Sequence, residues 1–214
     1  MKGLFLKDLK LMLNQKRFLA LILVICICFS FTDANYLFIL NFLSFVFCLI
    51  AITTISYDEF DEGNLYLFTL PFSRKQYVIE KFLLGLISGV SGIVIGIIIV
   101  ALSSFINGNV VTIDLAYISL FSLLILFLVI SIMLPIEINF SGDKSRIVLI
   151  IVFGIILLMF IGIKKILELN NIDISNLITN LNATLLLFLI TTLIIIGIFI
   201  SILISLHFIQ DKEF

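Results

Sequence analysis

Long apolar stretches alternate with short polar segments along the whole chain. Six of them approach or reach the roughly 20 apolar residues with which a helix crosses a hydrocarbon core about 30 Å thick. These stretches are residues 18–32, 36–56, 82–106, 115–135, 147–163 and 181–208. The pattern predicts an all-α integral membrane protein, in which six transmembrane helices form a single transmembrane domain over residues 1–214.

The composition excludes an ordinary soluble domain. Hydrophobic residues make up 62% of the chain and charged residues 13%, against about a half and a quarter in average proteins. No aspartate, glutamate, lysine, arginine or histidine falls near the middle of a predicted span, although ion-coupled transporters usually need such a residue there. We therefore expect a protein that is not an enzyme and that takes the energy for any transport from outside the membrane.

The distribution of lysine and arginine predicts the orientation, because cytoplasmic loops carry an excess of both. With a cytoplasmic N-terminus, only Lys164 and Lys165 lie outside. The inner face then carries Lys2, Lys7, Lys10, Lys16, Arg17, Arg74, Lys75, Lys81, Lys144, Arg146 and Lys212. Both termini are therefore predicted to be cytoplasmic.

Residues 1–17 are predicted to form an N-terminal amphipathic elbow helix. Lys7, Lys10, Asn14 and Arg17 recur at helical spacing, and apolar residues fill the other side. A basic helix of this kind lies in the membrane interface. We expect it to lead into the first span.

Residues 164–180 are predicted to form an extracellular interfacial segment between the fifth and sixth spans. The segment is too polar to span the membrane, yet it keeps several isoleucine and leucine residues. We therefore expect it to lie in the outer interface as one or two short helices. An outer gate is a further role that this position allows.

Two stripes of small residues indicate close helix contacts, as such stripes do in membrane proteins. They consist of Gly85, Gly89, Gly92 and Gly96 in the third span, and of Gly197, Ser201 and Ser205 in the last span. Packing within one chain explains such a stripe. An interface between subunits, or a surface that slides during transport, is the alternative.

The three cysteines all fall inside predicted spans. Cys26 and Cys28 are two residues apart, so they point in different directions on a helix and do not easily share a metal or a disulfide. We interpret them, with Cys48, as small packing residues and predict no metal site.

The polar segment 57–81 between the second and third spans is predicted to be a compact cytoplasmic coupling loop. Acidic residues open it, and they favour a helix start at 58–67. Pro71 then ends that helix, and Ser73 is a good N-cap for the next one. Exposed aromatic residues such as Tyr66 would form a docking surface, although a solvated loop with aromatic residues in the interface is the alternative.

Both cytoplasmic loops resemble those of ABC-2 type transporter permeases. In the first, the resemblance rests on Glu59, Gly63, Leu70-Pro71, Ser73-Arg74, Tyr77 and Lys81. In the second, residues 136–146, it rests on Pro135, Phe140, Lys144 and Arg146. The chain has Ser141 where these permeases usually have glycine directly after the phenylalanine, and Gly142 comes one position late. Within the family, the chain resembles the permease subunits of phenol-soluble modulin and lantibiotic exporters.

The resemblance implies a permease that works with separate cytoplasmic ABC ATPase subunits and with a second permease, as a homo- or heterodimer in the bacterial plasma membrane. The chain itself has no phosphate-binding G-x-x-x-x-G-K-[ST] loop, so ATP and magnesium would bind to the partner ATPase. The coupling residues that the resemblance implies are Asp58, Glu59, Asp61, Glu62, Gly63, Leu70, Pro71, Ser73, Arg74, Phe140, Gly142 and Lys144.

The substrate class that suits an apolar, uncharged path is an amphipathic or hydrophobic peptide of the antimicrobial or toxin type. Lipids or hydrophobic drugs are the alternative substrates. A membrane scaffold that recruits an ATPase without transporting anything is the alternative function. Membrane lipid is a further expected partner, and nothing in the sequence indicates nucleic acid.

Overall fold

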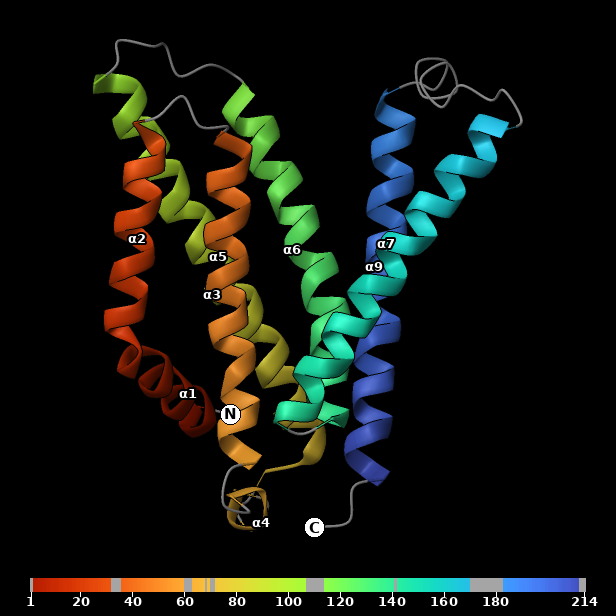
Figure 1. Ribbon diagram of the computed structural model, residues 1–214. Helices are drawn as coiled ribbons and strands as arrows, with labels where there is room; N and C mark the ends of the chain where they lie inside the picture. Colours follow the sequence, from red (N-terminus) through yellow and green to blue (C-terminus); the bar gives the residue numbers. More distant parts are fainter. Residues whose placement is uncertain are drawn as a thin grey trace.

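The computed structural model describes residues 2–31, 36–59, 63–67, 69, 72–106, 114–140, 142–169 and 183–211. Within these residues, all regular structure is helical, as the apolar stretches predict (Figure 1). The helices are α1 (Lys2–Asn14), α2 (Lys16–Ser30), α3 (Tyr36–Glu59), α4 (Gly63–Leu67), α5 (Arg74–Ile106), α6 (Asp114–Asn139), α7 (Asp143–Leu169) and α9 (Ala183–Asp211).

Four helices in the described part of the chain are long and apolar enough to cross a membrane: α3, α5, α6 from Leu115 onward, and α9 from Ile190 to Ile209. α1 and α2 are bent by 62° relative to each other. They count as a fifth span only if this bent pair is taken as one membrane crossing. α2 alone has 15 residues, which is about 22 Å of helix and too short for the hydrocarbon core. The predicted spans 18–32 and 147–163 thus coincide with helices, but the count of six is not established.

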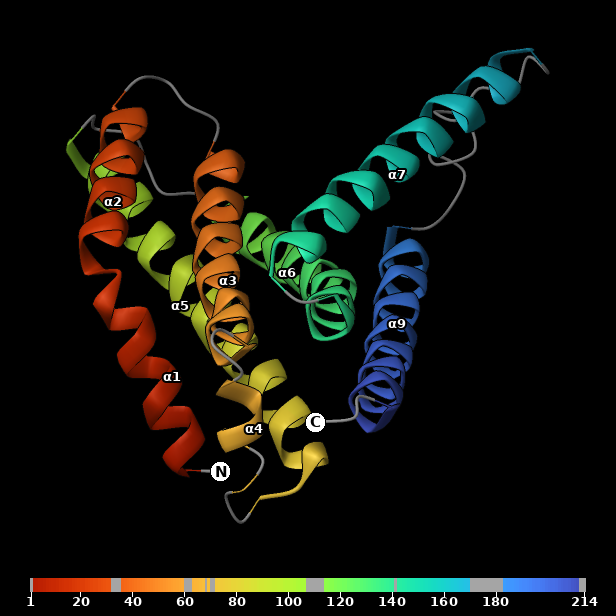
Figure 2. The same cartoon turned by 60° about the horizontal axis from the view of Figure 1, so that its bottom comes forward.

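The helices form one layered bundle with a loosely attached arm. α3 and α5 make the most extensive contact, α6 packs against both, and α9 packs mainly against α6 (Figure 1). α7 contacts α6 and leans away from the other helices (Figure 2). α4 lies beneath α3, at the end of the bundle where α1 begins and α9 ends (Figure 1). We call this end the α4 end.

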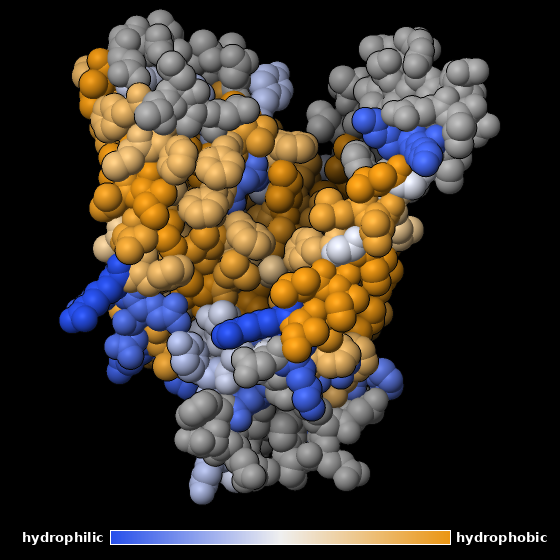
Figure 3. Space-filling model, in the orientation of Figure 1, coloured by the Kyte–Doolittle hydropathy of each residue, from blue (hydrophilic) through white to orange (hydrophobic). Residues whose placement is uncertain are grey.

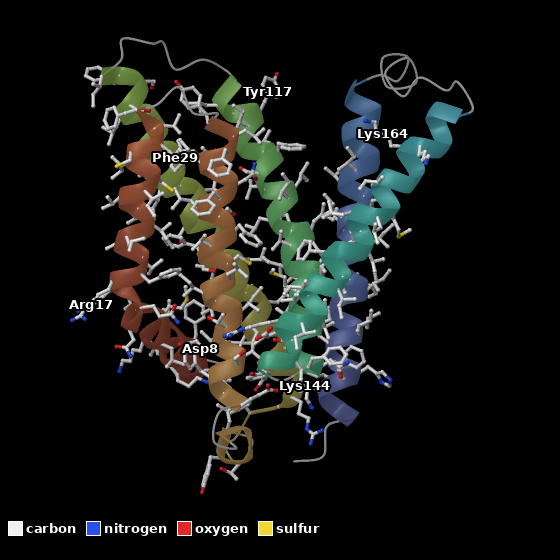
Figure 4. All side chains as sticks on the ribbon, viewed as in Figure 1. Asp8, Arg17, Phe29, Tyr117, Lys144 and Lys164 are labelled. Atoms are coloured by element: carbon white, nitrogen blue, oxygen red, sulfur yellow. The ribbon has the colours of Figure 1, made fainter. Side chains whose placement is uncertain are left out.

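The surface has the layering of a membrane protein. A broad hydrophobic band covers the middle of the molecule, and hydrophilic residues gather at its two ends (Figure 3). Lys164 lies at the end opposite α4, whereas Arg17 and Lys144 lie toward the α4 end (Figure 4). The described basic residues are therefore distributed unequally between the two ends.

The glycine stripe of α5 lies inside the chain, between α6 and α3. A Cβ at Gly85 or Gly89 would meet the side chain of Ile130 or Leu126 in α6. A Cβ at Gly92 would lie 2.8 Å from the carbonyl oxygen of Leu43 in α3, and Gly96 faces Leu40 of the same helix. Because glycine has no side chain, α5 approaches two neighbouring helices closely. Packing within the chain therefore explains this stripe.

The second stripe lies where α9 packs against α6. A Cβ at Gly197 would lie 3.6 Å from Ser131 Oγ in α6. Ser201 and Ser205 are buried on the same face, one and two turns further along α9. This stripe too is therefore accounted for by contact within the chain.

Two predicted boundaries are wrong. Pro135 does not end the fourth span, because α6 continues through it to Asn139, and neighbouring helices in a membrane protein compensate for the hydrogen bond that a proline removes. The second loop is therefore much shorter than 136–146. The outer segment 164–180 does not begin as an element separate from the preceding helix, because α7 continues to Leu169. Residues 170–180 lie outside the described part of the chain.

Candidate coupling site

The start of α5 is defined by a reciprocal cap. Ser73 Oγ accepts a hydrogen bond from the backbone N–H of Gln76 at 3.2 Å, and Gln76 Oε1 accepts one from the backbone N–H of Ser73 at 3.1 Å. This arrangement satisfies two donors that a helix start leaves without partners. It confirms Ser73 as the N-cap and fixes where the chain turns from the loop into α5.

Three helices meet above α4 at a buried charge cluster, which consists of Lys7, Asp8, Asp58 and Lys81. Lys81 Nζ pairs with Asp8 and lies 2.7 Å from Asp58 Oδ2. Lys7 Nζ lies 3.1 Å from Asp8 Oδ1 and also pairs with Asp58. Each lysine thus contacts both aspartates, and the cluster joins α1, α3 and α5.

Three further side chains adjoin the cluster: Thr54, Tyr77 and Glu80, which is buried and interacts with Asp8. Thr54 Oγ1 in α3 accepts a hydrogen bond from Lys81 Nζ at 2.9 Å. The Tyr77 hydroxyl donates to Asp58 Oδ2 at 3.1 Å, and Lys81 Nζ lies 5.2 Å from the centroid of the Tyr77 ring. Such contacts replace part of the interaction with water that a charged group loses when it is buried.

Burial distinguishes this cluster from surface ion pairs. The side chains of Asp8, Lys81 and Asp58 are 0%, 1% and 4% exposed, and only Lys7 reaches solvent, at 34%. In Figure 4, Asp8 points into the molecule, whereas Arg17 points away from it. Ion pairs in such surroundings are costly to break, because the charge that remains is buried without its partner.

Other polar contacts extend the site to α6 and α9. Ser56 in α3 donates a hydrogen bond to the carboxylate of Glu137 in α6. Arg74 Nη1, in the first turn of α5, donates to the backbone carbonyl of Ile209 in α9 at 2.9 Å. Polar contacts at the α4 end therefore join α1, α3, α5, α6 and α9.

The structure places the predicted coupling residues in different surroundings. Asp58 lies in the buried charge cluster rather than on a surface, and Glu59 is half-buried. Gly63 begins α4 directly against α3, since a Cβ there would lie 2.7 Å from the carbonyl oxygen of Asp58. Arg74 contacts α9. The positions that lie outside the described residues are Asp61, Glu62, Leu70 and Pro71.

The second loop forms a tight turn between α6 and α7. Phe140 and Lys144 are exposed there, and the carbonyl of Gly142 accepts a hydrogen bond from Ser145 Oγ at 2.7 Å. Gly142 has φ = 55°, a conformation that glycine adopts without strain. The late glycine of the sequence motif is therefore the residue that the turn requires.

Sequence reasoning missed the partnership of Lys7 and Asp8 with Asp58 and Lys81. Lys81 was expected only to end the cytoplasmic loop 57–81 and to count among the basic residues of the inner face. The signal that could have revealed its burial is local: Lys81 follows Val78 by three residues and directly precedes Phe82, and both are buried. A lysine on the apolar side of a helix requires buried acidic partners.

The three cysteines are free, with Cys26 and Cys48 buried and Cys28 exposed. Cys26 and Cys28 therefore do point in different directions. Within the residues that the structure describes, no group of histidine, cysteine, aspartate and glutamate could hold a metal ion.

The helices and the charged α4 end define a multi-pass membrane protein. Its sequence matches the family model described as ABC-2 family transporter protein over residues 3–210, nearly the whole chain. The chain therefore belongs to the ABC-2 transporter family, whose members are membrane components of ABC transporters. Neither a curated protein sequence nor a solved structure matches it.

Proposed function

We propose that this chain is the permease subunit of an ATP-driven exporter and that a separate cytoplasmic ATPase docks at the α4 end. The observation that carries the proposal is the buried charge cluster. It connects the end of α3, from which α4 begins, to α1 and α5. A force applied to α4 is thereby transmitted to three helices at once.

The contact between α4 and α3 supports this role. Gly63 leaves no space for a side chain between α4 and the last turn of α3, and Leu67 buries its side chain against the core. α4 therefore moves with the end of α3. ATP and magnesium, in this proposal, bind only to the ATPase, and nucleotide shifts the transporter between states because the two states contact it differently.

The α4 end is the cytoplasmic end in this proposal. Arg17 and Lys144 lie toward it, whereas Lys164 lies at the opposite end (Figure 4). Lys7 and Lys10 belong to α1, which begins at the α4 end, and Lys165 directly follows Lys164 in α7. An excess of basic residues marks the cytoplasmic side. In this proposal α1 lies in the inner interface, and α2 is a short span that the bilayer accommodates by becoming locally thinner. With α7 as a further span, the chain crosses the membrane six times and both termini are cytoplasmic.

Cysteine labelling tests the orientation. In a variant without Cys26, Cys28 and Cys48, we expect a membrane-impermeant maleimide added to intact cells to label Lys165→Cys and to spare Lys144→Cys. Both positions are exposed, so access to the reagent depends on the side of the membrane. Labelling of Lys144→Cys alone would reverse the orientation and remove the docking proposal.

The proposed cargo is an amphipathic or hydrophobic peptide, moved by a pair of permeases in the bacterial plasma membrane. The support is chemical. The outward faces of α2, α6, α7 and α9 are rich in exposed aliphatic and aromatic side chains, and a path made of such faces offers little to a strongly charged solute. Stimulation of ATP hydrolysis by candidate peptides, in vesicles that contain the assembled transporter, tests this substrate class.

Tyr66 provides the test of docking. Its side chain is 77% exposed on α4, and exposed aromatic residues are common energetic centres of interfaces, where truncation costs about 2 kcal/mol or more. We expect Tyr66→Ala to leave the permease folded and to lower its affinity for the ATPase more than tenfold, measured as co-purification over a dilution series.

Tyr117 is the matched control for this experiment. It is also a largely exposed tyrosine, at 65%, but it lies at the opposite end of the molecule (Figure 4). Tyr117→Ala should therefore leave co-purification unchanged. If Tyr66→Ala retains the ATPase at wild-type affinity, docking does not depend on the exposed face of α4.

A further inference from the structure

A pocket of about 640 Å³ lies between the junction of α1 and α2, the second half of α3, and the turn into α7. Its volume is within the range of about 300–1,000 Å³ that is typical of small-molecule sites. Figure 3 shows the face of the molecule that α2, α3 and α7 share, which is hollowed between them and has hydrophobic side walls. The pocket is separate from the buried charge cluster and from the exposed face of α4.

The wall that α3 contributes changes from apolar to polar along its length. Val46, Leu49 and Ile50 line the part nearer the middle of the membrane, and Thr53, Ser56 and Tyr57 line the part nearer the α4 end. These positions follow one another at helical spacing, so they share one face of α3. A ligand with an apolar tail and a polar head fits this wall in one orientation.

The polar part of the pocket carries a positive charge. Arg146 of α7 lines it and is exposed, and Gln15 lies across from it, donating a hydrogen bond to the Tyr57 hydroxyl at 3.2 Å. None of the described residues that line the pocket is acidic. Glu137 is near, but it is buried, accepts a hydrogen bond from Ser56 and does not line the pocket. Arg146 also has an interaction within the protein, and its exposed guanidinium, with five N–H donors, keeps donors for a ligand.

We infer that this pocket binds an anionic glycerophospholipid of the cytoplasmic leaflet. Its phosphate lies beside Arg146, whose planar guanidinium is suited to two hydrogen bonds with phosphate oxygens, and one acyl chain lies along Val46, Leu49 and Ile50. The depth of the polar part, at the α4 end, is that of the lipid headgroups. The leaflet follows from the proposed orientation, whereas the binding requires neither the ATPase nor a transported substrate.

The absence of tryptophan from the sequence allows a direct test, because one introduced tryptophan then reports alone. Phe18 lines the pocket and is 53% exposed, so Phe18→Trp places a fluorophore there. Leu203→Trp is the control, since Leu203 of α9 is similarly exposed, at 51%, on a surface away from the pocket. Purified protein is reconstituted in phosphatidylcholine vesicles that contain either phosphatidylglycerol or phosphatidylcholine with brominated acyl chains, which quench tryptophan on contact.

We expect brominated phosphatidylglycerol to quench the fluorescence of Phe18→Trp more strongly than brominated phosphatidylcholine does at the same content in the vesicle. The difference should correspond to an about fivefold preference of the pocket for phosphatidylglycerol. That ratio corresponds to the ~1 kcal/mol that one basic residue contributes to binding of anionic lipid. Leu203→Trp should show no preference. In the Phe18→Trp background, Arg146→Gln should abolish the preference, whereas Arg17→Gln, which removes an exposed charge that does not line the pocket, should retain it.

Three results would overturn the inference: equal quenching by the two lipids at Phe18→Trp, the same preference at Leu203→Trp, or a preference that survives Arg146→Gln. If a cationic amphipathic peptide relieves quenching where neither lipid is preferred, the pocket belongs to the transported peptide instead. Circular dichroism and gel filtration of the Arg146→Gln protein verify that it is folded. Because no ATPase is present, failure here leaves the docking experiment with Tyr66 unaffected.

Discussion

Replacing Lys81 by methionine should destabilise the protein more than any other single change proposed here. The side chain is 1% exposed and contacts Asp8 and Asp58, which are buried with it. Without Lys81, two buried carboxylates share Lys7 alone, and removing one partner of a buried ion pair typically costs about 3–5 kcal/mol. We expect the apparent unfolding temperature in detergent, followed by circular dichroism, to fall by roughly 10 °C.

Lys10→Met is the control for Lys81→Met. Lys10 is an exposed lysine of α1, and exposed charges contribute little to stability. Adding Asp8→Leu to Lys81→Met removes one of the two aspartates that Lys81 neutralises and should restore part of the lost stability, because Lys7 then no longer has to neutralise both aspartates. An unfolding temperature of Lys81→Met within about 2 °C of wild type would show that the cluster does not hold the three helices together.

Gly92→Ala should give the second large effect, because backbone atoms of α3 block the new methyl group. Its Cβ would lie 2.8 Å from the carbonyl oxygen of Leu43 and 3.0 Å from the Cα of Ser44. Backbone atoms cannot rotate away, so α3 and α5 must separate, and overpacking of this kind typically costs about 1–3 kcal/mol. The same thermal unfolding measurement detects the change.

Two other glycines calibrate that measurement. A methyl group at Gly89 meets only the side chain of Leu126, which can adjust, so Gly89→Ala should cost less than Gly92→Ala. A Cβ at Gly154 of α7 meets nothing within 4 Å, and alanine favours a helix over glycine by about 1 kcal/mol. Gly154→Ala should therefore be neutral or stabilising. Equal effects at all three positions would mean that helix propensity, rather than the approach of α5 to α3, determines stability.

The apolar stretches and their small residues were sufficient to predict the helical class, the approximate place of the four long apolar helices and the stripe of small residues in α5. The start of α5 also followed from the sequence, because Ser73 was predicted as its N-cap; the reciprocal hydrogen bond of Gln76 is seen only in the structure. These features depend on neighbours in sequence or on one helix face. They can be read without knowing which helices pack together.

The buried charge cluster could not be predicted in this way, because its partners lie far apart in the sequence. Asp8 and Lys81 are separated by 73 positions, and each looks like a solvated charge when only its own helix is considered. The end of α6 was misjudged for a related reason. The predicted fourth span ended with the apolar stretch at Pro135, whereas the helix continues through this buried proline to Asn139, which the packing of α6 against other helices allows.

The separation of Asp8 and Lys81 along the chain also has a consequence for biogenesis. During synthesis, α1 and α3 emerge before α5, so a nascent chain first holds Asp8 and Asp58 with only Lys7 to neutralise them. The two aspartates gain their second partner only when Lys81 arrives with the start of α5. We therefore expect α1 to stay hydrated at the membrane surface until α5 is in place. The N-terminal helix, though made first, would then be among the later parts to reach its final place.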